Sequence, residues 1–196
     1  MSSRIRTIIA IAVVGVASLA TGSAAASADA VGAGRSSHVW GTAEEVPGTA
    51  ALNQGGDANF NAMSCAAAGN CSAAGYYTDS SGRIQAFVVS QTSGTWHPAI
   101  KAPAIMADMS AMSCASAGNC SAGGYYTNSS GSQAFVVSQI NGTWRTAIEM
   151  PGTAALNSGG NAAIASVSCA SAGNCSAGGH YTDNSGNNQA FVASKS

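Results

Sequence analysis

Cysteine is the residue type in this sequence whose spacing most clearly indicates chemistry. The six cysteines form three pairs, and five residues separate the two members of every pair. An even set of locally paired cysteines is typical of disulfides formed in an oxidising compartment. Each closed loop of about seven residues would stabilise the fold by on the order of 2 kcal/mol, because it restricts the unfolded chain. The predicted disulfides are Cys65–Cys71, Cys114–Cys120 and Cys169–Cys175.

Metal binding and redox catalysis are the alternative uses of paired cysteines. Zinc sites favour two to four residues between paired cysteines with a His or Cys partner close by, and thiol redox catalysts use Cys-x-x-Cys. Neither spacing occurs here. Asp79 and Asp183 each offer a single carboxylate where a calcium loop presents several, so we expect them to cap their own turns. The sequence therefore predicts no metal and no cofactor.

Side chains for acid–base or nucleophilic catalysis are few and irregularly placed. The three histidines take no common position in the pattern described below, so they build no repeated site. The segment from Gly118 to Gly123 reads Gly-x-x-Ser-x-Gly, whereas a nucleophile elbow needs Gly-x-Ser-x-Gly on a strand-to-helix turn. Similar segments surround the other cysteine pairs, as expected for structural residues. We predict that the protein is not an enzyme.

Adjacent aromatic residues provide the candidate binding positions. They follow each cysteine pair at the same distance, with one histidine in place of a tyrosine. Adjacent residues of a strand point to opposite faces, so one member of each pair is expected to reach a surface. The predicted binding candidates are Tyr76, Tyr77, Tyr125, Tyr126, His180 and Tyr181.

These residues recur because the chain repeats one unit three times, over residues 40–95, 96–143 and 144–196. Each unit starts at a tryptophan, continues through the cysteine block and the aromatic pair, and reaches an Ala-Phe-Val segment. The third unit ends without the Gly-Thr-Trp that follows the other two. A matching tryptophan, Trp40, stands instead before the first unit.

Alternating apolar residues and Gly-containing turns predict four short strands in each unit, arranged as an antiparallel meander. The fold class is therefore all-β, with three four-stranded units that are typical of β-propeller blades. The Trp40 strand is expected to complete the sheet that ends at residues 191–194. Closed propellers normally have at least four blades, which leaves three alternatives open. Two or more chains share a ring, the blades form an open arc, or the fold is a β-trefoil.

The N-terminus has the layout of a secretory signal. Arg4 and Arg6 precede an apolar run of about thirteen residues, short of the roughly twenty that a membrane-spanning helix needs. Small residues then allow cleavage after Ala28 or Ala30. We expect a signal peptide at residues 1–28, an N-terminal lead at 29–39 and a β domain at 40–196. The sequence predicts a secreted protein that has no membrane partner.

The charge distribution excludes nucleic-acid binding. The formal net charge is −1, and only 8% of residues are charged. Binding to nucleic acid needs clustered Lys and Arg to displace counterions from phosphates. The basic residues after the signal stand singly, at Arg35, Arg83, Lys101, Arg145 and Lys195.

The repeated motif also resembles a known family. The block Ser-Cys-x-Ser-Ala-Gly-Asn-Cys-Ser-Ala-Gly-Gly-Tyr-Tyr-Thr, followed by Phe-Val and Gly-Thr-Trp, resembles the repeat of secreted bacterial β-propeller proteins related to the dispase autolysis-inducing protein. The resemblance covers residues 40–196. It implies a non-enzymatic secreted protein that acts on, or protects against, extracellular proteases. That family has more blades than this chain can make.

The residues and the resemblance together predict a secreted, non-enzymatic β-repeat protein. Its expected partner is an extracellular protein, and its expected effect is to modulate or resist proteases. A carbohydrate-binding, lectin-like protein is the alternative, because repeated Tyr and Asn on a β scaffold can form several shallow glycan sites. A ring shared by two chains would make the protein a homodimer.

Overall fold

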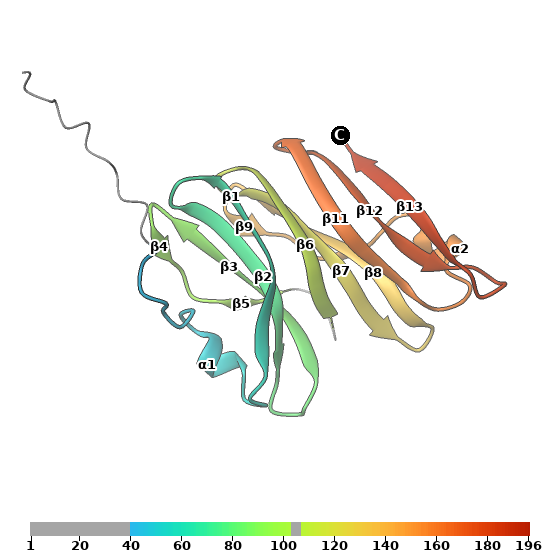
Figure 1. The fold of residues 1–196 in the computed structure, drawn as a ribbon, viewed down its shortest axis with the longest axis horizontal. Helices are drawn as coiled ribbons and strands as arrows, with labels where there is room; N and C mark the ends of the chain where they lie inside the picture. Colours follow the sequence, from blue (N-terminus) through green and yellow to red (C-terminus); the bar gives the residue numbers. More distant parts are fainter. Residues whose placement is uncertain (1–39, 103–106) are drawn as a thin grey trace, which may run out of the picture. The chain divides into compact units, whose positions relative to one another are not determined.

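The computed structural model describes residues 40–102 and 107–196. All described helices and strands lie in one compact unit, Ala43–Ser196. The predicted signal peptide, residues 1–28, and the lead, residues 29–39, lie outside the described residues. Three antiparallel sheets and two single-turn helices make up the unit, which confirms the all-β class (Figure 1).

The three sheets repeat one plan of three long antiparallel strands joined by hairpins. In the first sheet these strands are β1 (Ala58–Ala67), β2 (Asn70–Thr78) and β3 (Ile84–Thr92). In the second sheet they are β6 (Ala107–Ser116), β7 (Asn119–Asn128) and β8 (Gly131–Ile140). In the third sheet they are β11 (Ala162–Ser171), β12 (Asn174–Thr182) and β13 (Asn188–Lys195).

The strands around the tryptophans are only two residues long and belong to the sheet before them in the chain. Two-residue strands β4 (Thr95–Trp96) and β5 (Ile100–Lys101) both pair with β3. In the same way, β9 (Thr143–Trp144) and β10 (Ile148–Glu149) pair with β8. The first two sheets therefore have five strands each, instead of the predicted four.

The third sheet differs from the prediction because it has only three strands. The expected fourth strand, around Trp40, is not formed: Trp40 lies in no strand and its side chain is 98% exposed. Among the described residues, β13 pairs only with β12. The outer edge of β13 therefore keeps unpaired backbone groups that the equivalent strands β3 and β8 use for pairing.

Two single-turn helices, α1 (Thr49–Leu52) and α2 (Thr153–Leu156), were not predicted from the sequence. Each follows a glycine in the left-handed conformation, at φ 83° for Gly48 and φ 87° for Gly152. A four-residue Thr-Ala-Ala-Leu segment is too short to show helical periodicity. Helix α2 lies in the connection from the second sheet to the third, so it contributes to the junction between them.

The core lies between the sheets and follows the alternation of side chains along β3. Ala86 and Val88 join an apolar cluster with Phe135 and Val137 of the second sheet. Phe87 points to the opposite face, where it packs with Tyr77 and other residues of the first unit. A second inter-sheet cluster, containing Ile164 and Phe191, joins the second sheet to the third. Each sheet thus uses one face to pack on the next.

A glycine at a β-bulge lets the first two strands of each sheet approach closely. The register shifts at residues 60–62, 109–111 and 164–166 mark the bulges. A Cβ added at Gly75 would overlap the carbonyl oxygen of Asn59, and Gly124 and Gly179 meet the equivalent oxygens. This close approach explains why glycine directly precedes the aromatic pair in every unit.

Candidate functional site

The three predicted disulfides are present, and each closes the hairpin between the first two strands of a sheet. Their S–S distances are 2.01, 2.02 and 2.12 Å for Cys65–Cys71, Cys114–Cys120 and Cys169–Cys175. The paired cysteines face each other directly in the strand register. Three disulfides are consistent with an oxidising, extracellular-type environment. Within the described residues, no group of three or more His, Cys, Asp and Glu is placed to hold a metal ion.

The six predicted binding residues divide into two sets on opposite faces of the sheets. Tyr77 is 4% exposed and packs edge-on against Phe87, and burial raises its pKa. Tyr126 packs similarly on Phe135. Tyr181 packs against the second inter-sheet cluster. Tyr77 is therefore a core residue, and Tyr126 and Tyr181 are partly buried residues that pack against the inter-sheet clusters.

Tyr126 also makes a hydrogen bond that ties two strands of the second sheet. Its hydroxyl donates to Glu149 Oε2 of β10 at 2.9 Å. Burial, followed by this bond to a carboxylate, raises the pKa of the Tyr126 phenol. The Tyr126 phenol therefore stays neutral, and its bond to Glu149 holds β10 on the second sheet.

The first members of the pairs, Tyr76, Tyr125 and His180, occupy one repeated position on the other face and are half-buried. Their partners across the strand pair are Asn59, Asp108 and Ala163 of the first strands. Strand β6 contacts both β1 and β11, so these first strands of the sheets are neighbours. The three residues thus recur beside the place where the first strands of the three sheets meet.

A carboxylate that sequence analysis missed lies at this place. Asp108 is half-buried, and its Oδ1 accepts a hydrogen bond of 2.6 Å from Asn61 Nδ2 of the first sheet. Burial raises the pKa of Asp108, and the bond from Asn61 partly opposes that shift. Asp108 occurs in only one of the three units, so the repeat gave no signal for it. The pair is a polar junction between the first two sheets.

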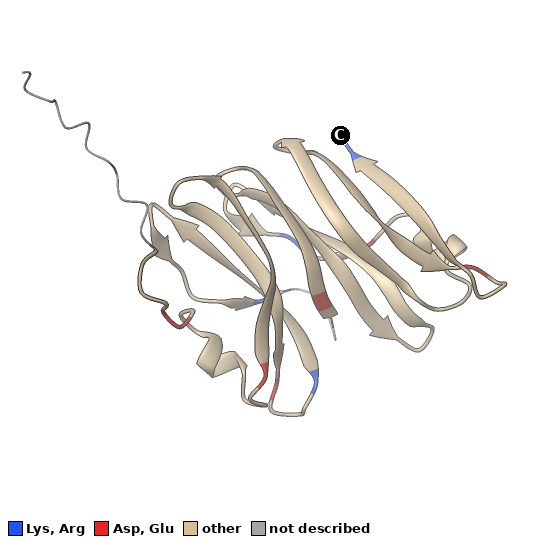
Figure 2. Cartoon of the chain, viewed as in Figure 1, with Lys and Arg blue, Asp and Glu red and all other residues tan. Residues whose placement is uncertain are grey.

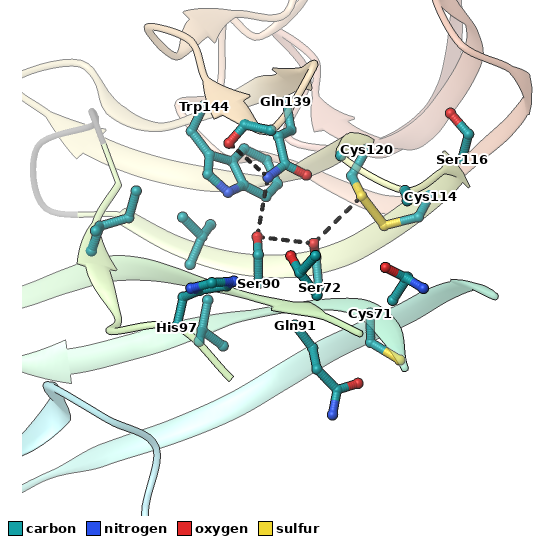
Figure 3. A pocket seen from close by; sticks show the side chains of 18 of the residues that line it. Cys71, Ser72, Ser90, Gln91, His97, Cys114, Ser116, Cys120, Gln139 and Trp144 are labelled. Atoms are coloured by element: carbon teal, nitrogen blue, oxygen red, sulfur yellow. Dashed lines mark hydrogen bonds between the residues drawn. A yellow bond between two sulfur atoms is a disulfide. The ribbon is translucent and has the colours of Figure 1, made fainter. Parts of the chain in front are cut away.

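A cavity of about 500 Å³ lies between the first and second sheets (Figure 3). A chain of polar side chains crosses it: the Ser72 and Ser90 hydroxyls lie 3.2 Å apart, and Gln139 Nε2 donates to Ser90 Oγ at 3.1 Å. The Ser72 hydroxyl also lies 3.5 Å from Cys120 Sγ, which as a disulfide sulfur can only accept. The indole of Trp144 forms part of the wall.

Two buried polar atoms at this cavity have no hydrogen-bond partner in the described part of the chain. They are Gln139 Oε1, an acceptor, and Trp144 Nε1, a donor. Gln139 is 4% exposed, so its amide is held in place by its bonds to Ser90 and to the Gly142 carbonyl. A small group that both donates and accepts, such as a hydroxyl, has the chemistry to satisfy both atoms. Neither Trp144 nor Gln139 was among the binding residues predicted from the sequence.

The acidic turns have the structural role that was predicted. Asp79 Oδ1 accepts the backbone N–H groups of Ser81 and Arg83, at 2.9 and 3.1 Å. Asp183 makes the same pattern with Ser185 and Asn187. These backbone hydrogen bonds are the main reason why the pKa of each carboxyl is lowered. Both carboxylates therefore cap their own hairpin turns.

Charged side chains are sparse over the described strands, and the basic ones stand singly (Figure 2). Within residues 40–102 and 107–196, no helix is long and apolar enough to cross a membrane. No profile of a known protein family matches the sequence, and a comparison with curated proteins finds no match either. The disulfide-linked all-β repeat and the sites just described therefore carry the functional argument.

Proposed function

We propose that the three sheets are blades of a β-propeller and that the chain is a secreted, non-enzymatic protein that binds another extracellular protein. The observation that carries the binding proposal is the repeated half-buried position of Tyr76, Tyr125 and His180 beside the neighbouring first strands. Amphipathic aromatic side chains are enriched at protein interfaces, because they combine a large apolar area with a polar end. We call these three residues the aromatic row.

The propeller arrangement is supported by how the units connect. Each short tryptophan strand pairs with the sheet that precedes it, which links consecutive blades. The same face of each sheet packs on the next, through apolar clusters built from equivalent strands. A β-trefoil would instead join its hairpins into one barrel, and the described strands form three separate sheets.

An extracellular protease is the partner that the sequence resemblance favours. The chain itself has features that limit cleavage: a disulfide closes the first hairpin of each sheet, and short turns join the three long strands within each sheet. We propose that the aromatic row contacts the protease and changes the rate of its autolysis. No residue of the chain reacts in this proposal, so the effect should be saturable and stoichiometric.

The test uses the mature protein and a purified secreted bacterial metalloprotease of the thermolysin type. Biolayer interferometry should show saturable binding, and the autolysis half-life should change with the mature protein present. The double variant Tyr76→Ser/Tyr125→Ser should weaken binding by about tenfold or more, as expected when interface aromatics are removed. The control Tyr77→Phe removes only a hydroxyl from the core face and should bind as the parent does. Parental binding by the double variant would rule out the aromatic row.

A glycan-binding role is the second candidate, and the unpaired atoms at the cavity favour it. Both atoms expose less than 1 Å² of surface, so the wall must open before a sugar hydroxyl can accept from Trp144 Nε1 and donate to Gln139 Oε1. Screening the mature protein against a panel of immobilised bacterial glycans tests this role. Gln139→Met should abolish glycan binding and leave protease binding unchanged, so the two candidates are distinguishable. Glycan binding that is unaffected by Gln139→Met would exclude this cavity.

A further inference from the structure

A second cavity, between the second and third sheets, is the repeat equivalent of the first one but has no tryptophan in its wall. Its volume is about 580 Å³. Ser121, Val136 and Ser138 line it at the positions that Ser72, Val88 and Ser90 take in the first cavity. The first cavity has Trp144 of β9 in its wall, next to β8. Among residues 40–102 and 107–196, the third sheet has no strand equivalent to β9, and no described strand lies at this place beside β13.

The chain contains an unused copy of the missing strand. The segment 40–45 corresponds to residues 144–149, because the two segments stand at the same distance before the helices α1 and α2. Trp40 matches Trp144, and Glu45 matches Glu149. Residues 144–149 lie on the second sheet and lead through α2 into the third. By the same geometry, residues 40–45 belong on a sheet that precedes the first one.

A second copy of the chain supplies that sheet. Val46 packs with Phe87, on the face of the first sheet that points away from the second. The six residues from Val46 back to Trp40 span at most roughly 20 Å when extended. From this face, a path to the second cavity must pass the first and the second sheet. Packed sheets lie about 10 Å apart, so even a straight path across both sheets uses the full length of the segment. The segment is too short to pass around both sheets to its own cavity.

One repeated hydrogen bond joins each sheet to the next, and the groups for a further copy of this bond remain on the first and third sheets. Ser64 Oγ accepts the Cys114 N–H at 2.9 Å, and Ser113 Oγ accepts the Cys169 N–H at 3.0 Å. The next equivalent bond would join Ser168 Oγ of the third sheet to the Cys65 N–H of a first sheet. Both residues are exposed. A third sheet placed before the first sheet of another copy would complete the series.

The outer faces of the first and third sheets expose apolar residues whose equivalents are buried between sheets. This is expected if each outer face also packs on a sheet. Val88 is fully buried between the first two sheets, and Val136 is partly buried between the second and third. Val192, at the same position of the third sheet, is 88% exposed. Met63 of the first sheet is 56% exposed, whereas its equivalent Met112 packs against the first inter-sheet cluster. Each end therefore exposes one half of a contact that the chain makes twice internally.

The polar groups of the segment also match the second cavity. Lys195 lies at its wall, at the position of Gln139 in the first cavity, and the docking segment carries Glu44 and Glu45. Tyr126 donates to Glu149 within the second sheet, so Tyr181 and Glu45 are the equivalent pair between copies. The opposite charges and the matching hydrogen-bond pair favour the Trp40 segment as the occupant of the second cavity over an apolar segment that lacks these groups.

We infer that two copies of this chain exchange their Trp40 segments, each tryptophan filling the cavity between the second and third sheets of the other copy. This inference rests on the proposed propeller arrangement and not on binding of a protease or glycan. The reciprocal exchange pairs each free third sheet with a first sheet, so a symmetric dimer of six sheets has no free end.

The test is the mass of the mature protein in solution, measured by light scattering coupled to gel filtration at micromolar concentration. The expected mass is twice that of one mature chain. Trp40→Ala and Val192→Glu should each weaken dimerisation by about thirtyfold or more, the factor for loss of an interface hot spot. Both side chains are exposed in the single chain, so the variants should fold as the parent does.

The control variant is Ile84→Glu, which introduces the same charge at an exposed aliphatic position of β3 and should remain dimeric. Thermal unfolding of every variant verifies its fold. A monomeric parent, or a dimer that survives both Trp40→Ala and Val192→Glu, would overturn the inference. Protease and glycan binding are then measured on the monomeric Val192→Glu variant, so that failure of the proposed function is seen separately.

Discussion

At the scale of single residues, the polar groups between the sheets are placed by packing more than by their own chemistry. Ser64 and Ser113 each accept the backbone N–H of the next unit's first cysteine, so one Ser-Cys dipeptide both closes a hairpin and links two sheets. Small residues suit this role, because they let neighbouring sheets approach while providing a hydrogen-bond acceptor. The low-complexity appearance of the motif reflects these two demands.

Asp108 gives a prediction about stability and pH. Its folded-state pKa is raised, mainly by burial, above the ordinary value of about 3.9 that it has in the unfolded chain. The folded state therefore holds the proton more tightly, and stability falls as pH rises from about 4 through the folded pKa. Asp108→Asn keeps an oxygen for Asn61 and removes this loss. The variant should be more stable than the parent at pH 7, and the gain should vanish at pH 3.5.

Urea unfolding at the two pH values measures this difference in the free energy of unfolding. Asp57→Asn, at an exposed position just before β1, is the matched control and should leave stability unchanged at both pH values. An equal gain from Asp108→Asn at pH 3.5 and pH 7 would show that desolvation of the charge is not its cause.

At the scale of strands and hairpins, the sequence predicted the local features well. The cysteine pairing and the capping aspartates depend on residues near one another in the chain, so residue type and spacing alone indicated them. The Asn61–Asp108 and Gln139–Ser90 contacts were not predictable in this way. They join different units, and they depend on which face of each sheet packs on the next.

The two adjacent glycines of the third unit, Gly178 and Gly179, allow a specific test of the close approach at the β-bulge. A Cβ at Gly179 would overlap the Ala163 carbonyl oxygen, whereas a Cβ at Gly178 would meet only ordinary contacts, the nearest at 3.5 Å. Gly179→Ala should therefore cost about 1–3 kcal/mol of stability, as expected for overpacking. Gly178→Ala should be neutral or stabilise by up to about 1 kcal/mol, because it restricts the unfolded chain. The first unit already has Ala74 at that position.

Chemical unfolding of the two single variants measures this contrast. The residues are adjacent in β12 and undergo the same substitution, so each serves as the control for the other. Similar losses from both would mean that the close approach at the bulge relaxes easily.

At the scale of the whole molecule, the repeat was predicted but its incomplete last sheet was not. The sequence placed Trp40 on the third sheet, and the structure leaves that sheet with three strands and Trp40 exposed. Counting units cannot say whether an unpaired strand joins its own chain or another, because that choice depends on the distance between the chain ends. The short reach from Val46 to Trp40 is the reason why we propose that the segment joins a second copy.

The unequal cover of the three sheets predicts unequal hydrogen exchange. Strand β8 pairs with β7 on one side and with β9 and β10 on the other, whereas β13 pairs only with β12. Amides on the outer edge of β13 have no ladder partner among the described strands of one chain, so they should exchange rapidly in the monomeric Val192→Glu variant. In the parent at micromolar concentration, the docked Trp40 segment should slow exchange at residues 191–195 by about tenfold or more.

Protection of β8 should be the same in both proteins, which makes it the internal reference for mass-spectrometric measurement. Equal exchange of β13 in the parent and the variant would mean that no strand covers this edge.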